Sequence, residues 1–75
     1  MASSALRNVD ITSEPIQLYK ILKFEGLVSN GGEAKAAVAE GLVRVNGQTE
    51  TRKRKQIVAG DIIEFGDEKM IIRLI

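Results

Sequence analysis

The hydrophobic period of the chain changes at Gly41, and no other feature constrains the fold as much. Before this residue, apolar side chains such as Ile16, Tyr19 and Leu22 recur every three or four positions, which is the spacing of one helix face. After it, from residues 42–45 onward, the pattern alternates as in a β-strand. This order predicts an α+β fold in which two short N-terminal helices pack on a small, mostly antiparallel sheet.

Polar residues and glycines set the limits of both helices. The first begins at residues 13–15, where Ser and Glu offer caps and Pro suits a first turn, and it ends at Gly26. Ser and Asn at positions 29–30 give a second start signal, and the following residues favour a helix from Glu33 to Gly41.

Turn residues divide the rest of the chain into strands. Asn46 and Gly47 are a strong hairpin signal because both residue types tolerate positive φ. Further turns are predicted at residues 59–61 and 66–67. The predicted strands are residues 42–45, 48–52, 62–65 and 70–75, with an additional edge strand at residues 5–12.

Composition bounds the class of protein. A chain of 75 residues predicts one domain, residues 1–75, with residues 1–13 as an N-terminal segment. The chain contains no Cys, so it forms neither a disulfide nor a thiolate metal site. The sequence shows no signal-peptide pattern and no apolar run of membrane-spanning length. We therefore expect a cytoplasmic monomer without a metal or another cofactor.

Side chains suited to catalysis are scarce. The chain has no His, which together with the lack of Cys removes the commonest nucleophile–base pairs. Asp and Glu at positions 61–68 lie around predicted turns, where carboxylates usually cap backbone groups. The Asn-Gly-Gly of residues 30–32 does not match the Walker spacing to Lys35. It is either a helix start that exposes N–H groups to one phosphate or a flexible loop. We expect that the protein is not an enzyme.

Arg52, Lys53, Arg54 and Lys55 form a row of basic residues in a chain whose net charge is +1. Like charges side by side repel one another, so a fold keeps such a row where water or an anionic partner covers it. On an extended strand, alternate members would point to opposite faces. The row must then leave the sheet as an exposed ribbon or loop before residues 57–58 return to the core. We interpret it as an anion-binding segment.

Other basic residues either extend this segment or only solvate the surface. Lys20 and Lys23 lie on one side of the first helix, and Lys35 lies near the start of the second. Arg44 precedes the hairpin tip, where Glu50 is an alternative cross-strand partner for it. Because the acidic residues gather later in the chain, the small net charge conceals a basic face opposite an acidic one.

The aromatic residues Tyr19, Phe24 and Phe65 stand at core spacings. An exposed aromatic platform for stacked bases is therefore not expected. A basic surface of this kind recognises the phosphates and the shape of a nucleic acid.

Several motifs resemble one known family. The segment from Ile16 to Gly47, with the strings SNGGEAK and AEGLVRVNG, and the later string VAGDIIEF resemble the RNA-binding domain named after ribosomal small-subunit protein S4, the α-L motif. The resemblance spans residues 14–66 and is to the small free-standing bacterial members. It implies an RNA-binding face made by the two helices and the adjoining hairpin.

Carried over by position, the resemblance implies contacts from the basic row and from the start of the second helix. The latter are Ser29, Gly31, Gly32 and Lys35. Many family members carry Arg directly after the Ser that opens this helix, whereas here Asn30 follows.

Two functional hypotheses follow. The first is a non-catalytic domain that binds structured RNA, either ribosomal or transfer RNA, alone or on the ribosome. The second is a protein-interaction module of the ubiquitin-like kind, whose basic row meets an acidic partner. A ubiquitin-like carrier needs a terminal Gly-Gly for activation, whereas this sequence has Leu74 and Ile75 at that place. A third possibility is attachment to an anionic membrane through the basic row. The chain lacks the apolar helical face that would anchor it there.

Overall fold

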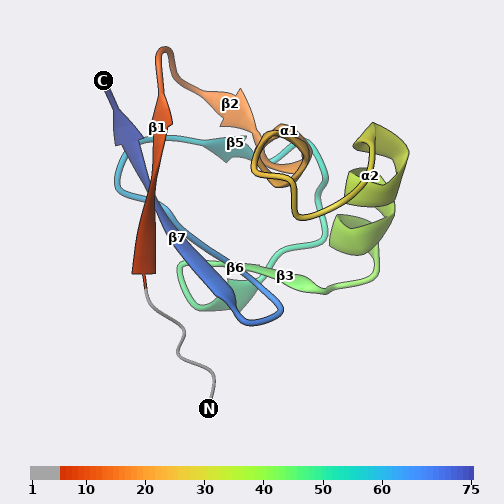
Figure 1. Cartoon of the computed structure of the whole chain (residues 1–75). Helices are drawn as coiled ribbons and strands as arrows, with labels where there is room; N and C mark the ends of the chain where they lie inside the picture. The colour runs from red at the N-terminus through yellow and green to blue at the C-terminus, as the bar shows by residue number, and fades with distance from the viewer. Residues whose placement is uncertain (1–5) are drawn as a thin grey trace.

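A computed structural model describes residues 6–75 of the chain (Figure 1). Within this range the helices are α1 (Leu18–Phe24) and α2 (Gly31–Ala39). The strands are β1 (Leu6–Ile11), β2 (Ile16–Gln17), β3 (Val43–Val45), β4 (Gln48–Thr49), β5 (Gln56–Ile57), β6 (Ile62–Phe65) and β7 (Glu68–Leu74). The predicted edge strand is confirmed as β1, although residue 5 lies outside the described residues.

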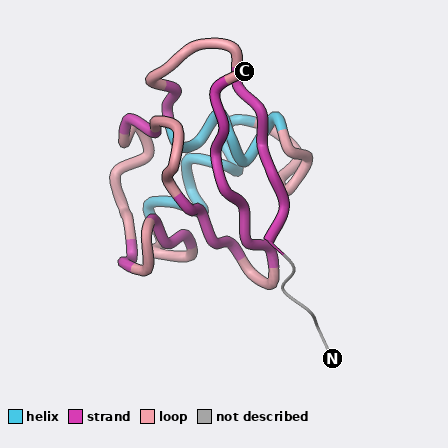
Figure 2. Tube along the Cα trace, turned by 90° about the vertical axis from the view of Figure 1, so that its left-hand side faces the viewer, coloured by secondary structure: helices cyan, strands magenta, loops and turns pink. Residues whose placement is uncertain are grey.

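Five strands form the main sheet, in the order β1-β7-β6-β3-β4. Every neighbouring pair is antiparallel except β1, which lies parallel to β7. Strands β2 and β5 form a separate antiparallel ribbon next to α1, and Figure 2 shows the helices behind the long strands of the main sheet. The predicted α+β fold, two helices on a mostly antiparallel sheet, is confirmed.

The helices and the sheet share one hydrophobic core. In β3, Val43 and Val45 are buried while Arg44 between them is exposed, so one face of the sheet is apolar and meets the helices. The small side chains of Ala34 and Ala37 are buried in α2 and allow a close approach to its neighbours. The buried cluster contains Val9, Ile11, Leu18, Ile21, Leu22, Ala34, Ala37, Val38, Val43, Val45, Ile57, Ile63, Met70 and Ile72.

The first helix begins later than predicted. It starts at Leu18 rather than at residues 13–15, because Ile16 and Gln17 instead pair as β2 with Ile57 and Gln56 of β5. Helical periodicity alone could not reveal this pairing, which joins segments about forty positions apart in the sequence. The end at Gly26 is confirmed, with φ of +73° at that glycine.

The second helix follows its sequence signals closely. Asn30 is the N-cap, and its side-chain oxygen accepts a hydrogen bond from the Glu33 N–H at 2.8 Å. The helix includes Gly31 and Gly32, two residues earlier than predicted, and its last residue is Ala39.

The predicted hairpin tip at Asn46 and Gly47 is confirmed, with φ of 54° and 85°. The Asn46 side chain also accepts from the Ile62 N–H at 2.9 Å and donates to Asp61 at 3.1 Å. These bonds join the hairpin tip to the turn that precedes β6. The strand after the tip is shorter than predicted and covers only Gln48–Thr49.

The return of the chain to the core is confirmed for one of two residues. Ile57 is 0% exposed, whereas Val58 is 41% exposed, so the prediction for Val58 was wrong. The predicted turn at residues 59–61 forms next, and the strand of residues 62–65 is confirmed as β6. The last strand, β7, begins two residues earlier than predicted because Glu68 pairs with Phe65.

Replacing Ile57 by Ala should lower the free energy of unfolding by about 2–5 kcal/mol, because it leaves a cavity in a closed core. Val58→Ala, one residue later and exposed, should change it by less than about 1 kcal/mol. Urea unfolding followed by far-UV circular dichroism measures both. Equal losses in the two variants would contradict the burial difference between these neighbours.

Candidate nucleic-acid interface

The row of basic residues forms a turn, which we call the basic turn (Arg52, Lys53, Arg54 and Lys55). The Lys55 N–H donates to the Arg52 carbonyl oxygen at 3.0 Å, so the segment is not extended and its side chains do not alternate between two faces. The predicted exposure is confirmed for three of the four residues, and Lys55 is half-buried.

Backbone hydrogen bonds hold the basic turn against the start of α1. The Leu18 N–H donates to the Lys55 carbonyl at 2.9 Å, and the Tyr19 N–H donates to the Lys53 carbonyl at 3.1 Å. The first N–H groups of a helix have no partner inside the helix, and the N-cap residue Gln17 makes no side-chain cap bond. The basic turn therefore serves as the cap of α1. Local sequence patterns contain no signal for a cap that comes from a segment more than thirty residues away.

Glu50 neutralises one member of the basic turn. Its carboxylate accepts from Arg52 Nε at 2.9 Å, from Arg52 Nη2 at 3.1 Å and from the Arg52 N–H at 2.9 Å. These bonds, the side-chain ones above all, lower the pKa of Glu50 to about 2. The same pair raises the pKa of Arg52. The alternative partner predicted for Glu50, Arg44, was wrong.

Tyr19 connects the basic turn to the start of α2. Its backbone N–H binds the turn, while its ring lies 4.9 Å from Lys35 Nζ, a cation–π distance. Gly31 packs against the same ring, because a Cβ at this glycine would lie 3.9 Å from both Tyr19 Cε2 and Lys23 Cδ. The structure thus brings Lys23, Lys35 and Gly31 together across the two helices.

Glu33 occupies part of the start of α2. Its carboxylate accepts a hydrogen bond from the Ser29 N–H, and its own N–H donates to Asn30, a reciprocal arrangement like a capping box. Ser29 and Gly32 are exposed beside it. A phosphate at this helix start would therefore meet a carboxylate as well as N–H groups.

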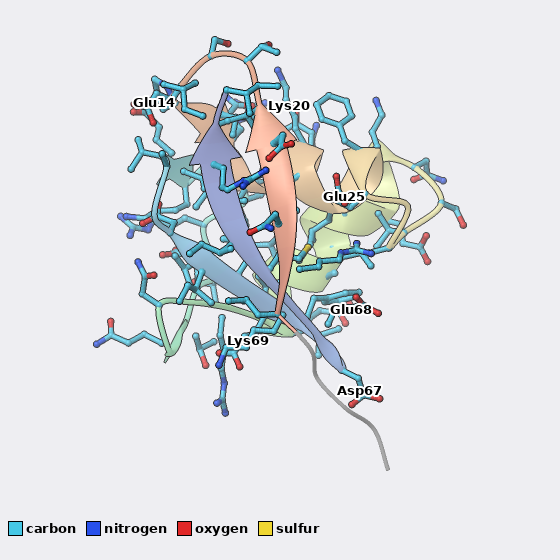
Figure 3. The ribbon with its side chains drawn as sticks, turned by 60° about the vertical axis from the view of Figure 1, so that its left-hand side comes forward. Glu14, Lys20, Glu25, Asp67, Glu68 and Lys69 are labelled. Carbon is cyan, nitrogen blue, oxygen red and sulfur yellow. The ribbon has the colours of Figure 1, made fainter. Side chains whose placement is uncertain are left out.

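Lys20 is exposed on α1. In Figure 3 it lies at the same end of the molecule as Glu14, while Asp67, Glu68 and Lys69 lie at the opposite end. Glu68 is not a free acidic group, because Arg7 lies 3.7 Å from it. We use the name basic surface for the set Lys20, Lys23, Lys35, Lys53, Arg54 and Lys55. Within residues 6–75, none of these six forms a salt bridge with a carboxylate.

Arg44 is not brought to the basic surface. It projects from the exposed face of β3, opposite Thr49 of β4 and Glu64 of β6. The helices cover the other face of this sheet. The prediction that Arg44 borders the same site therefore lacks structural support.

Phe24 departs most clearly from expectation. The sequence placed it in the core together with Tyr19 and Phe65, but its side chain is 62% exposed. The other two rings are partly buried against the core. The inference that no aromatic ring is available on the surface was wrong.

Asp61, one of the acidic residues at the predicted turns, binds backbone and side-chain donors. Asp61 accepts hydrogen bonds from the Val58 N–H at 3.0 Å and from Asn46 at 3.1 Å, which is the capping role predicted for carboxylates at turns. No group of three or more carboxylates in residues 6–75 is arranged to hold a metal ion. Neither described helix has the length and apolarity needed to cross a membrane.

Comparison with known sequences identifies relatives of this chain. The family model of the S4 domain matches residues 9–73. YbcJ of Escherichia coli strain K12, named as a candidate RNA-binding protein, is 50% identical over 50 residues, which are 67% of this chain and 71% of YbcJ. RlbA of Bacillus subtilis strain 168, whose name gives ribosome maturation as its probable role, is 32% identical over 57 residues, 76% of this chain and 80% of RlbA.

Two solved structures share the fold. The solution structure of E. coli YbcJ, described as revealing an α-L motif involved in RNA binding, has a TM-score of 0.65 and 37% identity and covers 97% of this chain and 91% of that one. Ribosomal protein S4e of Thermoplasma acidophilum has a TM-score of 0.63 and 29% identity and covers 77% of this chain and 31% of that one. The resemblance predicted from the motifs is confirmed, and this chain belongs to the S4 domain family.

Proposed function

We propose that this protein binds structured RNA, ribosomal or transfer RNA, through the basic surface and without catalysing a reaction. The observation that carries the proposal is the basic turn, whose backbone is bonded to α1 while Lys53, Arg54 and Lys55 have no carboxylate partner among the described residues. Cations on a backbone held in this way meet phosphates without first breaking ion pairs. The names of YbcJ and RlbA support RNA and the ribosome as partners.

The electrostatic contribution should make RNA binding depend on salt. Three to five phosphate contacts would make log affinity fall with log salt at a slope of roughly −2 to −4, at ~0.7–0.9 per contact. Most of these contacts would come from one continuous region, because Tyr19 joins the basic turn to Lys35 and Gly31. We still predict that the protein binds RNA as a monomer and in the cytoplasm.

The first test is to identify the RNA. The tagged protein is isolated from cells at low salt, and the co-purifying nucleic acid is sequenced beside that of a variant with all four residues of the basic turn changed to Ala. We expect one structured RNA to be enriched and to be lost in the variant. A stoichiometric protein partner that resists RNase, without any enriched RNA, would instead support the ubiquitin-like alternative.

The double variant Lys53→Ala/Arg54→Ala should flatten the salt slope by roughly 1.4–1.8, because two phosphate contacts are lost. Both side chains are exposed, and the backbone bonds of the turn remain. The matched control is Arg44→Ala/Lys69→Ala, which removes two positive charges from the main sheet. There both residues are strand-register neighbours of Glu64. Titration of labelled RNA at several salt concentrations measures both slopes. Equal changes of the salt slope in the two double variants would show that net charge alone determines RNA binding.

Glu50→Gln should strengthen RNA binding and steepen the salt slope by up to about 0.9, because Arg52 is released to contact a phosphate. Since the pKa of Glu50 is about 2, the wild-type pair stays ionised from pH 8 down to pH 4. Acidification over this range should therefore not reproduce the effect of the variant. An unchanged slope in Glu50→Gln would place Arg52 outside the RNA contact.

A further inference from the structure

We propose that the hollow beside Phe24 binds one unpaired nucleobase of the RNA, with the Phe24 ring as its stacking surface. This inference rests on the proposed function and deepens it. The basic surface contacts phosphates, which carry no sequence information, whereas a base site would select RNA that has an unpaired nucleotide.

The Phe24 ring borders two neighbouring hollows. The larger one, of about 390 Å³, is lined by Phe24 together with Ser13, Pro15, Ile16, Gln17, Lys20 and Gln56. The second, of about 310 Å³, shares Ser13, Ile16 and Phe24 with it. These volumes lie at the small end of the range for small-ligand sites, and they suit a single base better than a larger ligand.

Polar groups suited to a base edge lie in the larger hollow. Gln17 and Gln56 stand directly opposite each other in the ribbon of β2 and β5, and both line the hollow. Each amide side chain offers a donor and an acceptor, which is what the hydrogen-bonding edge of a base requires. Ser13 adds a hydroxyl group at the rim.

Cations are placed for the phosphate of the same nucleotide. Lys20 lines the hollow one turn before Phe24, and Lys23 Nζ lies 5.9 Å from the centroid of the Phe24 ring. Lys20, a member of the basic surface, also lines the hollow, and Gln56 follows directly after Lys55 in the chain. A strand whose phosphates lie on the basic surface would pass this hollow.

The carboxylates of Asp10 in β1 and of Glu14 in the loop after it already have partners. Asp10, which borders the second hollow, accepts from Arg73 Nε at 2.9 Å, and Glu14 accepts from the Ala59 N–H at 2.8 Å. The positive charge of Arg73 offsets that of Asp10 and so reduces its repulsion of an incoming phosphate. The bond to Glu14 comes from an uncharged N–H group and gives no such offset. An isolated exposed Phe needs no explanation. Here, however, Lys20, Gln17 and Gln56 line the same hollow as the ring, and these polar groups favour a nucleotide over an apolar protein side chain.

The test uses a single-tryptophan reporter. The wild-type chain contains no Trp, so Phe24→Trp introduces the only indole and keeps an aromatic surface. The probes are a fully paired RNA duplex and the same duplex with one unpaired adenosine, each carrying a dye for anisotropy. We expect both RNAs to bind at low salt by anisotropy, and only the RNA with the unpaired base to quench the indole emission. The matched control, Leu42→Trp, places the indole at a position that is 54% exposed and outside the hollow, and should show no quenching.

Phe24→Ala gives an independent measure that avoids a new aromatic ring. It should weaken binding of the RNA with the unpaired base by about 5- to 150-fold, the value of one stacked base, and change binding of the paired duplex by less than about twofold. Ala is a better helix former than Phe, so α1 should remain folded, which circular dichroism checks.

The outcomes separate this inference from the proposed function. Binding of both RNAs without selective quenching, or equal quenching in Phe24→Trp and Leu42→Trp, would overturn the base site and leave the RNA-binding proposal standing. Failure of every RNA to bind would overturn both. Quenching by an acidic or apolar peptide, but by neither RNA, would assign the hollow to a protein partner and overturn the base site.

Discussion

Two backbone hydrogen bonds between α1 and the basic turn organise the candidate site. The first N–H groups of α1 require acceptors, and the carbonyls of Lys53 and Lys55 supply them. Because the cap consists of carbonyl groups, none of the four basic side chains is used to cap α1. The same segment therefore completes a helix and presents cations, and these two roles do not compete.

The core makes this arrangement rigid on both sides. Leu18, the first residue of α1, and Ile57, which follows the basic turn, are each fully buried. Strand β2, which directly precedes Leu18, pairs with β5, which contains Ile57 and directly follows the basic turn. The turn is thus bounded by buried residues and bonded to a helix, so its backbone is held in place before any RNA binds. Preorganisation of this kind reduces the entropy lost on binding.

Sequence patterns predicted most of the fold and part of the site. Local signals were reliable where one residue type suits one backbone conformation, as at Gly26, at the Asn46 and Gly47 tip, and at the Asn30 cap. They failed where a residue's environment comes from distant segments. Ile16 has the spacing of a helix face, but it pairs with Ile57 in the ribbon of β2 and β5. Phe24 has the spacing of a core residue, but it is exposed to solvent. A periodicity defines a face of a helix, and only the packed structure decides what covers that face.

The sequence by itself determined the α+β order, the hairpin, the presence of an exposed basic row and membership of the S4 domain family. These depend on short-range chemistry: helix caps, positive φ, alternation, and the repulsion of adjacent charges. The tertiary structure decided that the basic row caps α1, that Glu50 neutralises Arg52, that Arg44 lies in the sheet away from the helices, and that Phe24 is exposed beside two glutamines. Each of these depends on contacts or burial set by the folded chain, which a reading of local pattern does not contain.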